Sequence, residues 1–241
     1  MIRGLSLVFA MGFTGVGSTV VRAQIMDDQI YSLVLFDQLE YRRTGNGNPV
    51  GWEMRAWVGG DFTRLWVKSE ADLATVGGEG YAEAQLLYSR LYSPFWEWQL
   101  GARVDFGYGG GSNEARVLAV LGLEGLAPYW FEVEPALFVS HKGDVSVRFT
   151  ATYDMFVTQR AIVQPRVEAN AAVQSVAEFG VGSGLNDIAL GLRLRYEFRR
   201  EYAPYVGVDW TQLFAGTADL ARQGGSAVSE VALVAGLRLW F

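Results

Sequence analysis

The chain of 241 residues contains no cysteine and a single histidine, His141. Without cysteine there is no disulfide framework, no thiolate metal site and no cysteine nucleophile. Charged residues are also scarce, at 19%, and acidic residues predominate, so the formal net charge is −6. An acidic balance disfavours nucleic acid and anionic polymers as partners, and it suits cations.

Long hydrophobic runs are missing as well, because no later stretch approaches the ~18 unbroken apolar residues of a transmembrane helix. The amino-terminal segment is apolar over residues 5–21, follows Arg3 and ends at the small residue Ala23. A transmembrane helix is the competing interpretation, but the segment is short and interrupted by glycines. We therefore expect a secretory signal peptide over residues 1–23 and one domain over residues 24–241.

Alternation of apolar and polar residues dominates the chain after the signal. From Trp96 to Tyr108 every second residue is apolar, with aromatic side chains at both ends and aliphatic ones between. Such a stretch is longer than the roughly 5–6 residues of a soluble strand. Two aromatic girdles on one face are typical of a strand that crosses lipid. A soluble sandwich would also alternate, but strand length, girdles and export signal together favour lipid outside and a polar lumen inside.

Turn signals divide the domain into about twelve alternating segments. Short turns and longer, more polar links follow each other, an arrangement that outer-membrane barrels adopt with the short turns in the periplasm. We predict an all-β fold, a transmembrane antiparallel up-and-down β-barrel of about 12 strands. The expected strands cover 30–42, 50–60, 61–70, 79–92, 95–107, 115–126, 129–140, 144–157, 161–172, 186–199, 203–214 and 228–241.

The carboxyl end is the strongest single indication of location. Phe241 is the last residue, and apolar residues precede it at every second position back to Val231. This pattern resembles the C-terminal signature of outer-membrane proteins, and a buried edge strand that ends at the terminus is the alternative. Together with the signal peptide it predicts the bacterial outer membrane.

The polar residues that alternate with the apolar ones along each strand predict a charged lumen. Its expected carboxylates are Glu40, Glu53, Glu83, Glu97, Asp105, Glu132, Glu134, Asp154, Glu168, Glu197 and Asp209. Its expected cations are Arg55, Lys68, Arg103, Arg148, Arg166, Arg193 and Arg195. Opposite charges in a narrow space pair, because an unpaired one is costly. A structural ion-pair ladder and an acidic path for cations are both compatible with this set.

Residues for catalysis and for soft-metal binding are few. His141 lies in a tight turn, and Asp144 three residues on is a weak partner for an outer-membrane hydrolase. We therefore predict that the protein is not an enzyme. Copper sites prefer Met, His or Cys, and after the signal only Met26, Met54 and Met155 remain besides His141. The segment Met26-Asp27-Asp28 is a plausible metal-binding patch.

Several segments resemble the copper resistance protein B family of outer-membrane proteins. They are DDQIYSLVLFDQLEYR (27–42), WVGGD (57–61), LYSR (87–90), GLAPYWFEVE (125–134), SGLNDIALGLRLRYEFRREYAPYVGV (183–208) and FAGTADLAR (214–222). The resemblance spans nearly all of residues 26–241 and implies a barrel associated with copper binding and copper homeostasis. It implies copper ions and outer-membrane lipid as partners, with a periplasmic multicopper oxidase as a candidate partner. We expect a monomer.

One departure from the family pattern bears on metal binding. Many members carry a Met- and His-rich segment between signal and barrel, whereas here the signal leads almost directly into Met26. Copper held by the barrel would then depend on carboxylates, which suit Cu(II) better than Cu(I). We predict a copper resistance protein that binds or conducts copper through an acidic lumen; the alternative is a structural or general passive barrel with an ion-paired, plugged lumen. The candidate metal ligands are Glu132, Glu134, Glu40, Met26, Asp27 and Asp28.

Overall fold

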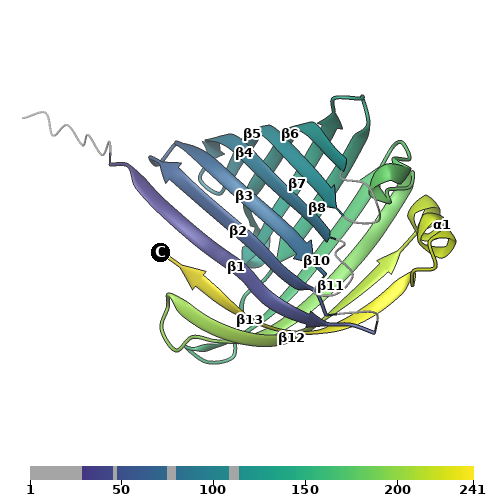
Figure 1. Ribbon diagram of the computed structural model, residues 1–241. Coiled ribbons are helices and arrows are strands. Elements are labelled where there is room, and N and C mark those ends of the chain that lie inside the picture. The colour runs from purple at the N-terminus through teal and green to yellow at the C-terminus, as the bar shows by residue number, and fades with distance from the viewer. Residues whose placement is uncertain (1–28, 46–47, 75–79, 109–113) are drawn as a thin grey trace, which may run out of the picture.

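The computed structural model describes residues 29–45, 48–74, 80–108 and 114–241. A single antiparallel sheet closes on itself, because β1 pairs with β2 on one side and with β13 on the other (Figure 1). The short β9 continues β8 after an interruption, so the wall has twelve strand positions, and the predicted barrel is confirmed. The strands are β1 (Tyr31–Arg43), β2 (Val50–Gly59), β3 (Thr63–Leu73), β4 (Gly80–Ser93), β5 (Trp96–Tyr108), β6 (Glu114–Ala127), β7 (Phe131–Ser140), β8 (Val145–Thr152), β9 (Met155–Phe156), β10 (Ala161–Ala172), β11 (Gly184–Tyr196), β12 (Tyr202–Leu213) and β13 (Ser229–Trp240).

The two faces of the wall follow the sequence alternation. On β5, Leu100 and Phe106 are exposed outside, whereas Arg103 and Asp105 are buried inside the barrel. On β13, Leu233 is 63% exposed. Apolar side chains on the outside of a closed wall require lipid as their surroundings. The closed pairing of β1 with β13 also rules out the soluble sandwich.

Both described ends of the chain lie at one end of the barrel (Figure 1). The short turns lie there, including the 3-10 turn η1 (Pro128–Trp130), and this end faces the periplasm by the usual orientation of such barrels. Most links at the opposite end are longer, the tight turn 141–144 between β7 and β8 being the exception, and the predicted link 173–185 contains the turn η2 (Ala177–Phe179). The predicted signal peptide, residues 1–23, lies outside the described residues.

A helix that the sequence did not predict lies in the link between β12 and β13. It is α1 (Ala215–Gln223), at the outer end of the barrel (Figure 1). It docks closely: a Cβ on Gly182 would lie 2.1 Å from the carbonyl carbon of Gly216. The Asn186 amide donates to the Thr217 hydroxyl at 2.7 Å. Nine residues are too few for a stable isolated helix, so this packing stabilises it. In the described part of the chain, no helix is long and apolar enough to cross a bilayer.

Two irregularities interrupt the regular pairing of the strands. The predicted strand 144–157 is interrupted at Tyr153 and Asp154, beside Pro165 of β10, which has no N–H to donate to β8. On β1, the register shifts between Phe36 and Gln38, and this β-bulge turns both Asp37 and Gln38 into the lumen.

Candidate functional site: the charged lumen

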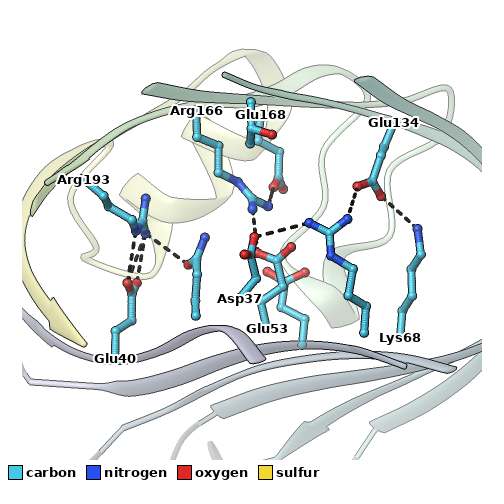
Figure 2. A network of polar contacts seen from close by, with 12 residues as sticks. Asp37, Glu40, Glu53, Lys68, Glu134, Arg166, Glu168 and Arg193 are labelled. Atoms are coloured by element: carbon cyan, nitrogen blue, oxygen red, sulfur yellow. Dashed lines mark hydrogen bonds and ion pairs between the residues drawn. The ribbon is translucent and has the colours of Figure 1, made fainter. Parts of the chain in front are cut away.

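Ion pairs cross the lumen between β2–β3 and the opposite wall. Glu134 of β7 accepts from Arg55 Nη1 at 3.0 Å and from Lys68 Nζ at 2.8 Å. Arg166 of β10 donates to Glu53 of β2 at 2.6 Å. Figure 2 shows these side chains pointing toward one another from opposite walls. We call this group, together with Glu70, Glu83, Glu124, Arg148 and Glu168, the cross-lumen network.

A row of carboxylates explains why this network forms. Glu53, Glu70, Glu83 and Asp105 lie directly opposite one another on the adjacent strands β2 to β5. Like charges in such positions repel and destabilise a sheet. Guanidinium groups offset the repulsion, and Arg148 alone lies 3.2 Å from Glu70 and 3.0 Å from Glu83. The remaining partners are Arg166 for Glu53, Arg103 for Glu83 and Asp105, and Arg116 for Asp105.

A second group surrounds Arg193 on β11. Its Nη2 lies 3.1 Å from Glu40 and 2.9 Å from Asp209. Tyr205 donates its hydroxyl proton to Glu40 at 2.9 Å, and Arg42 pairs with Glu40 at 2.7 Å. Glu40 is only 2% exposed. Its carboxylate is therefore already fully engaged by two cations and a hydroxyl group.

The outer half of the lumen holds a cavity of about 320 Å³, which we call the outer cavity. Carboxylates are in excess among the charged residues that line it. They are Glu53, Glu70, Asp72, Glu168, Asp209 and Glu230, against Arg42, Arg166 and Arg193. Among the described residues, the Glu230 side chain takes part in no hydrogen bond or ion pair, and Asp72 Oδ1 is buried without a hydrogen-bond partner. The lining of this cavity therefore keeps a net negative charge after its ion pairs are counted.

A smaller cavity of about 70 Å³ lies within the cross-lumen network. Arg55, Lys68, Glu134 and Arg148 line it, so its walls are the paired charges themselves. The two cavities share Glu53, Glu70 and Arg166 in their linings. A cation moving inward from the outer cavity would meet these three side chains first.

The predicted metal ligands lie in separate parts of the lumen. Glu134 belongs to the cross-lumen network and Glu40 to the group around Arg193. Glu132 accepts one long hydrogen bond, from Thr152 at 3.5 Å. Within the described ranges, no three His, Cys, Asp or Glu side chains gather as a preformed metal centre. The predicted ligands Met26, Asp27 and Asp28 lie outside the described residues.

The lumen assignments from sequence are confirmed for the paired residues, and several partners were missed. Asp37 was missed because the bulge cannot be read from strict alternation, although the adjacent polar pair Asp37-Gln38 was a signal. Asp72 was missed because the predicted strand ended at residue 70, whereas Glu70 lies on the same face as Lys68 and could have been found from the alternation. Glu124 alternates with Leu121 and Leu123 and could have been found from the pattern.

The geometry around His141 does not form a catalytic dyad. Its ring is exposed, with Nδ1 3.3 Å from the carbonyl oxygen of Val117. The neighbouring Ser140 donates its hydroxyl proton to Asp144 at 2.8 Å. A nucleophile activated by this histidine would need the Ser140 hydroxyl on the imidazole instead. The turn therefore lacks the arrangement that the hydrolase hypothesis requires.

The sequence model described as copper resistance protein B precursor (CopB) matches residues 30–241. This chain belongs to the copper resistance protein B family. It is 44% identical to copper resistance protein B of Escherichia coli over 217 residues, 90% of this chain and 72% of that protein. It is 38% identical over 218 residues to a copper resistance protein B homolog of Pseudomonas syringae pv. tomato, with the same coverage.

Solved structures agree with the barrel. The NanC porin superimposes with a TM-score of 0.53 at 14% identity, over 87% of this chain and 99% of that one. Outer membrane phospholipase A from Escherichia coli gives 0.52 at 11% identity, over 86% and 92%. At such identities the likeness shows the fold alone. The protein is an outer-membrane barrel of the copper resistance protein B family.

Proposed function

We propose that this member of the copper resistance protein B family binds copper cations in the outer cavity of its lumen. The observation that carries the proposal is the excess of carboxylates over guanidinium groups in that cavity. Charges of one sign on low-dielectric walls concentrate counter-ions. Carboxylate oxygens suit Cu(II) better than Cu(I), so Cu(II) is the proposed substrate.

Two acids carry most of the proposed affinity. Glu230 has no partner among the described residues, and one oxygen of Asp72 has no donor facing it. Neither would have to break all its bonds to accept a cation. By contrast, Glu134 and Glu40 would each have to give up two cationic partners.

An equilibrium titration of the purified barrel with Cu(II) tests the proposal. The double variant Asp72→Asn/Glu230→Gln should bind Cu(II) more weakly, on the order of tenfold or more, since each lost carboxylate removes about 1 kcal/mol of attraction. The matched control is Asp61→Asn/Glu201→Gln, which removes two exposed acids from periplasmic turns. Equal affinity in both variants would contradict binding in the outer cavity.

Passage of copper through the barrel is the further part of this proposal. A cation would have to exchange with the guanidinium groups of the cross-lumen network. If liposomes that hold the barrel pass no more copper than empty ones, conduction fails while binding in the outer cavity still stands.

The cross-lumen pairs favour a second candidate, a passive structural barrel with a plugged lumen. Bonds such as Arg166–Glu53 join opposite walls and narrow the path between the cavities. This candidate requires both copper titration and copper flux to equal those of an unrelated control barrel.

The ligands predicted from the sequence stay within the proposal. Glu132 is the best placed of them, because its only described hydrogen bond is the long one from Thr152. Neutralising Glu132 and Glu134 together should lower copper content, and unchanged metal content would count against both. Glu40 and Met26-Asp27-Asp28 are tested in the same way. A periplasmic multicopper oxidase partner and a monomeric state are proposed as well, with co-purification and light scattering as their tests.

A further inference from the structure

Two turns meet at the periplasmic end of the barrel and form an open cavity between them. The backbone N–H of Glu197 donates to the carbonyl oxygen of Arg160 at 2.8 Å, which joins the β9–β10 turn to the end of β11. The cavity has a volume of about 640 Å³. It is lined by Phe156, Gln159, Arg160, Glu197, Phe198, Arg199 and Arg200.

This cavity is positively charged, in contrast to the lumen. The side chains of Arg160, Arg199 and Arg200 are exposed, and none forms an ion pair with any residue that the structure describes. The one acid in the lining, Glu197, lies 3.8 Å from Arg195. Three unpaired arginines on a chain of net charge −6 form a strongly charged local patch.

Aromatic side chains on the lipid-facing side of the barrel wall border the same cavity. Phe198 continues the outward series of β11 after Leu194 and Tyr196, and its ring packs edge-on against Tyr196 at 5.0 Å. Phe198 is 61% exposed and Phe156 is 68% exposed. Aromatic rings of this kind lie at headgroup level, where apolar chains meet polar groups. The arginines therefore lie at the height of lipid phosphates.

We propose that this cavity binds the phosphate-bearing headgroup of an anionic phospholipid in the periplasmic leaflet. Guanidinium groups present paired N–H donors that match phosphate oxygens. Phe156 and Phe198 would contact the glycerol and upper acyl region of the same molecule. An acidic periplasmic protein would contact the arginines but not the aromatic rings, because these rings lie on the lipid-facing side of the barrel wall.

Native mass spectrometry of the full chain, titrated with phosphatidylglycerol or phosphatidylcholine, tests this site. The wild type should prefer phosphatidylglycerol, and the variant Arg160→Ala/Arg199→Ala/Arg200→Ala should lose this preference. Each arginine removed should lower the affinity for phosphatidylglycerol about fivefold. Replacing the three by lysine should retain part of the preference, because the charge remains. The control Arg43→Ala removes an exposed arginine without an ion pair in the described chain, at the outer end of β1, and should change nothing.

Each outcome decides the proposal. Equal binding of the two lipids by the wild type would overturn it, as would a preference that survives the triple alanine variant. Inorganic phosphate alone should give no adduct; retention of phosphate as tight as that of phosphatidylglycerol would assign the arginines to free phosphate instead. A loss of preference only in Arg43→Ala would move the site to the opposite rim. Far-UV circular dichroism of all variants checks that the barrel is folded.

Discussion

The cross-lumen network and the outer cavity are built from the same residue types, yet they differ in the ratio of acidic to basic side chains. In the network each carboxylate faces at least one guanidinium or ammonium group, often from the opposite wall. In the outer cavity the acids outnumber the arginines, and Glu230 has no partner among the described residues. One region therefore holds the walls together, and the other retains negative charge.

This difference shows that an acidic lumen is not uniformly available to cations. Breaking a buried ion pair leaves an uncompensated charge, which costs several kcal/mol. A free carboxylate carries no such penalty when a cation arrives. The predictions below therefore separate stability, which depends on the network, from copper binding, which depends on the cavity.

Replacing Arg148 by methionine should have the largest effect on stability. It removes the cation shared by Glu70, Glu83 and Glu168, and we expect a loss of about 3–5 kcal/mol in the free energy of unfolding. Urea unfolding in lipid vesicles measures this. The control Lys142→Met breaks an exposed pair with Glu178 and should cost less than about 1 kcal/mol. Equal losses in the two variants would contradict a structural role for the network.

A double-mutant cycle on Lys68 and Glu134 should give the next largest effect. Their atoms lie 2.8 Å apart across the lumen, so Lys68→Met and Glu134→Gln should be coupled by about 1–3 kcal/mol. The same unfolding experiment, carried out on both single variants and the double variant, yields this coupling energy. Additive losses would mean that the two walls are not held together by this pair.

Glu230→Gln should lower copper affinity without lowering stability, and so should distinguish the outer cavity from the cross-lumen network most clearly. Because its carboxylate has no described partner, the free energy of unfolding should change by less than ~0.5 kcal/mol. Cu(II) affinity should nevertheless fall about fivefold, the factor that ~1 kcal/mol of lost attraction produces. A stability loss like that of Arg148→Met would show that Glu230 is a hidden member of the network.

His141→Ala should have the smallest effect. The ring is exposed, and its Nδ1 lies within hydrogen-bond distance of the Val117 carbonyl oxygen. Cu(II) affinity, unfolding and esterase activity should all equal those of the wild type within error. A drop in hydrolytic activity would restore the enzyme hypothesis, and a drop in copper affinity would move the binding site to the outer surface.

Much of the lumen could be predicted from the sequence, because period two in a strand determines which face each side chain occupies. Arg103 and Asp105 on β5 and Arg193 on β11 were assigned correctly for this reason. Pairing across the barrel could not be predicted, since Arg148 and Glu83 are 65 positions apart and meet only after closure. The adjacent polar pair Asp37-Gln38 was the one sequence signal of the bulge on β1, but its register shift is a property of two neighbouring strands.

By itself, the sequence determined the barrel, its approximate strand boundaries and the inward or outward direction of most side chains. These follow from local alternation and from turn residues, neither of which depends on a distant contact. Only the tertiary structure decided which charges are paired, that α1 docks on Gly182, and that the turns bearing Arg160 and Arg199 share one cavity. These features depend on the distance between segments far apart in the chain, and that distance exists only once β1 and β13 have closed the wall.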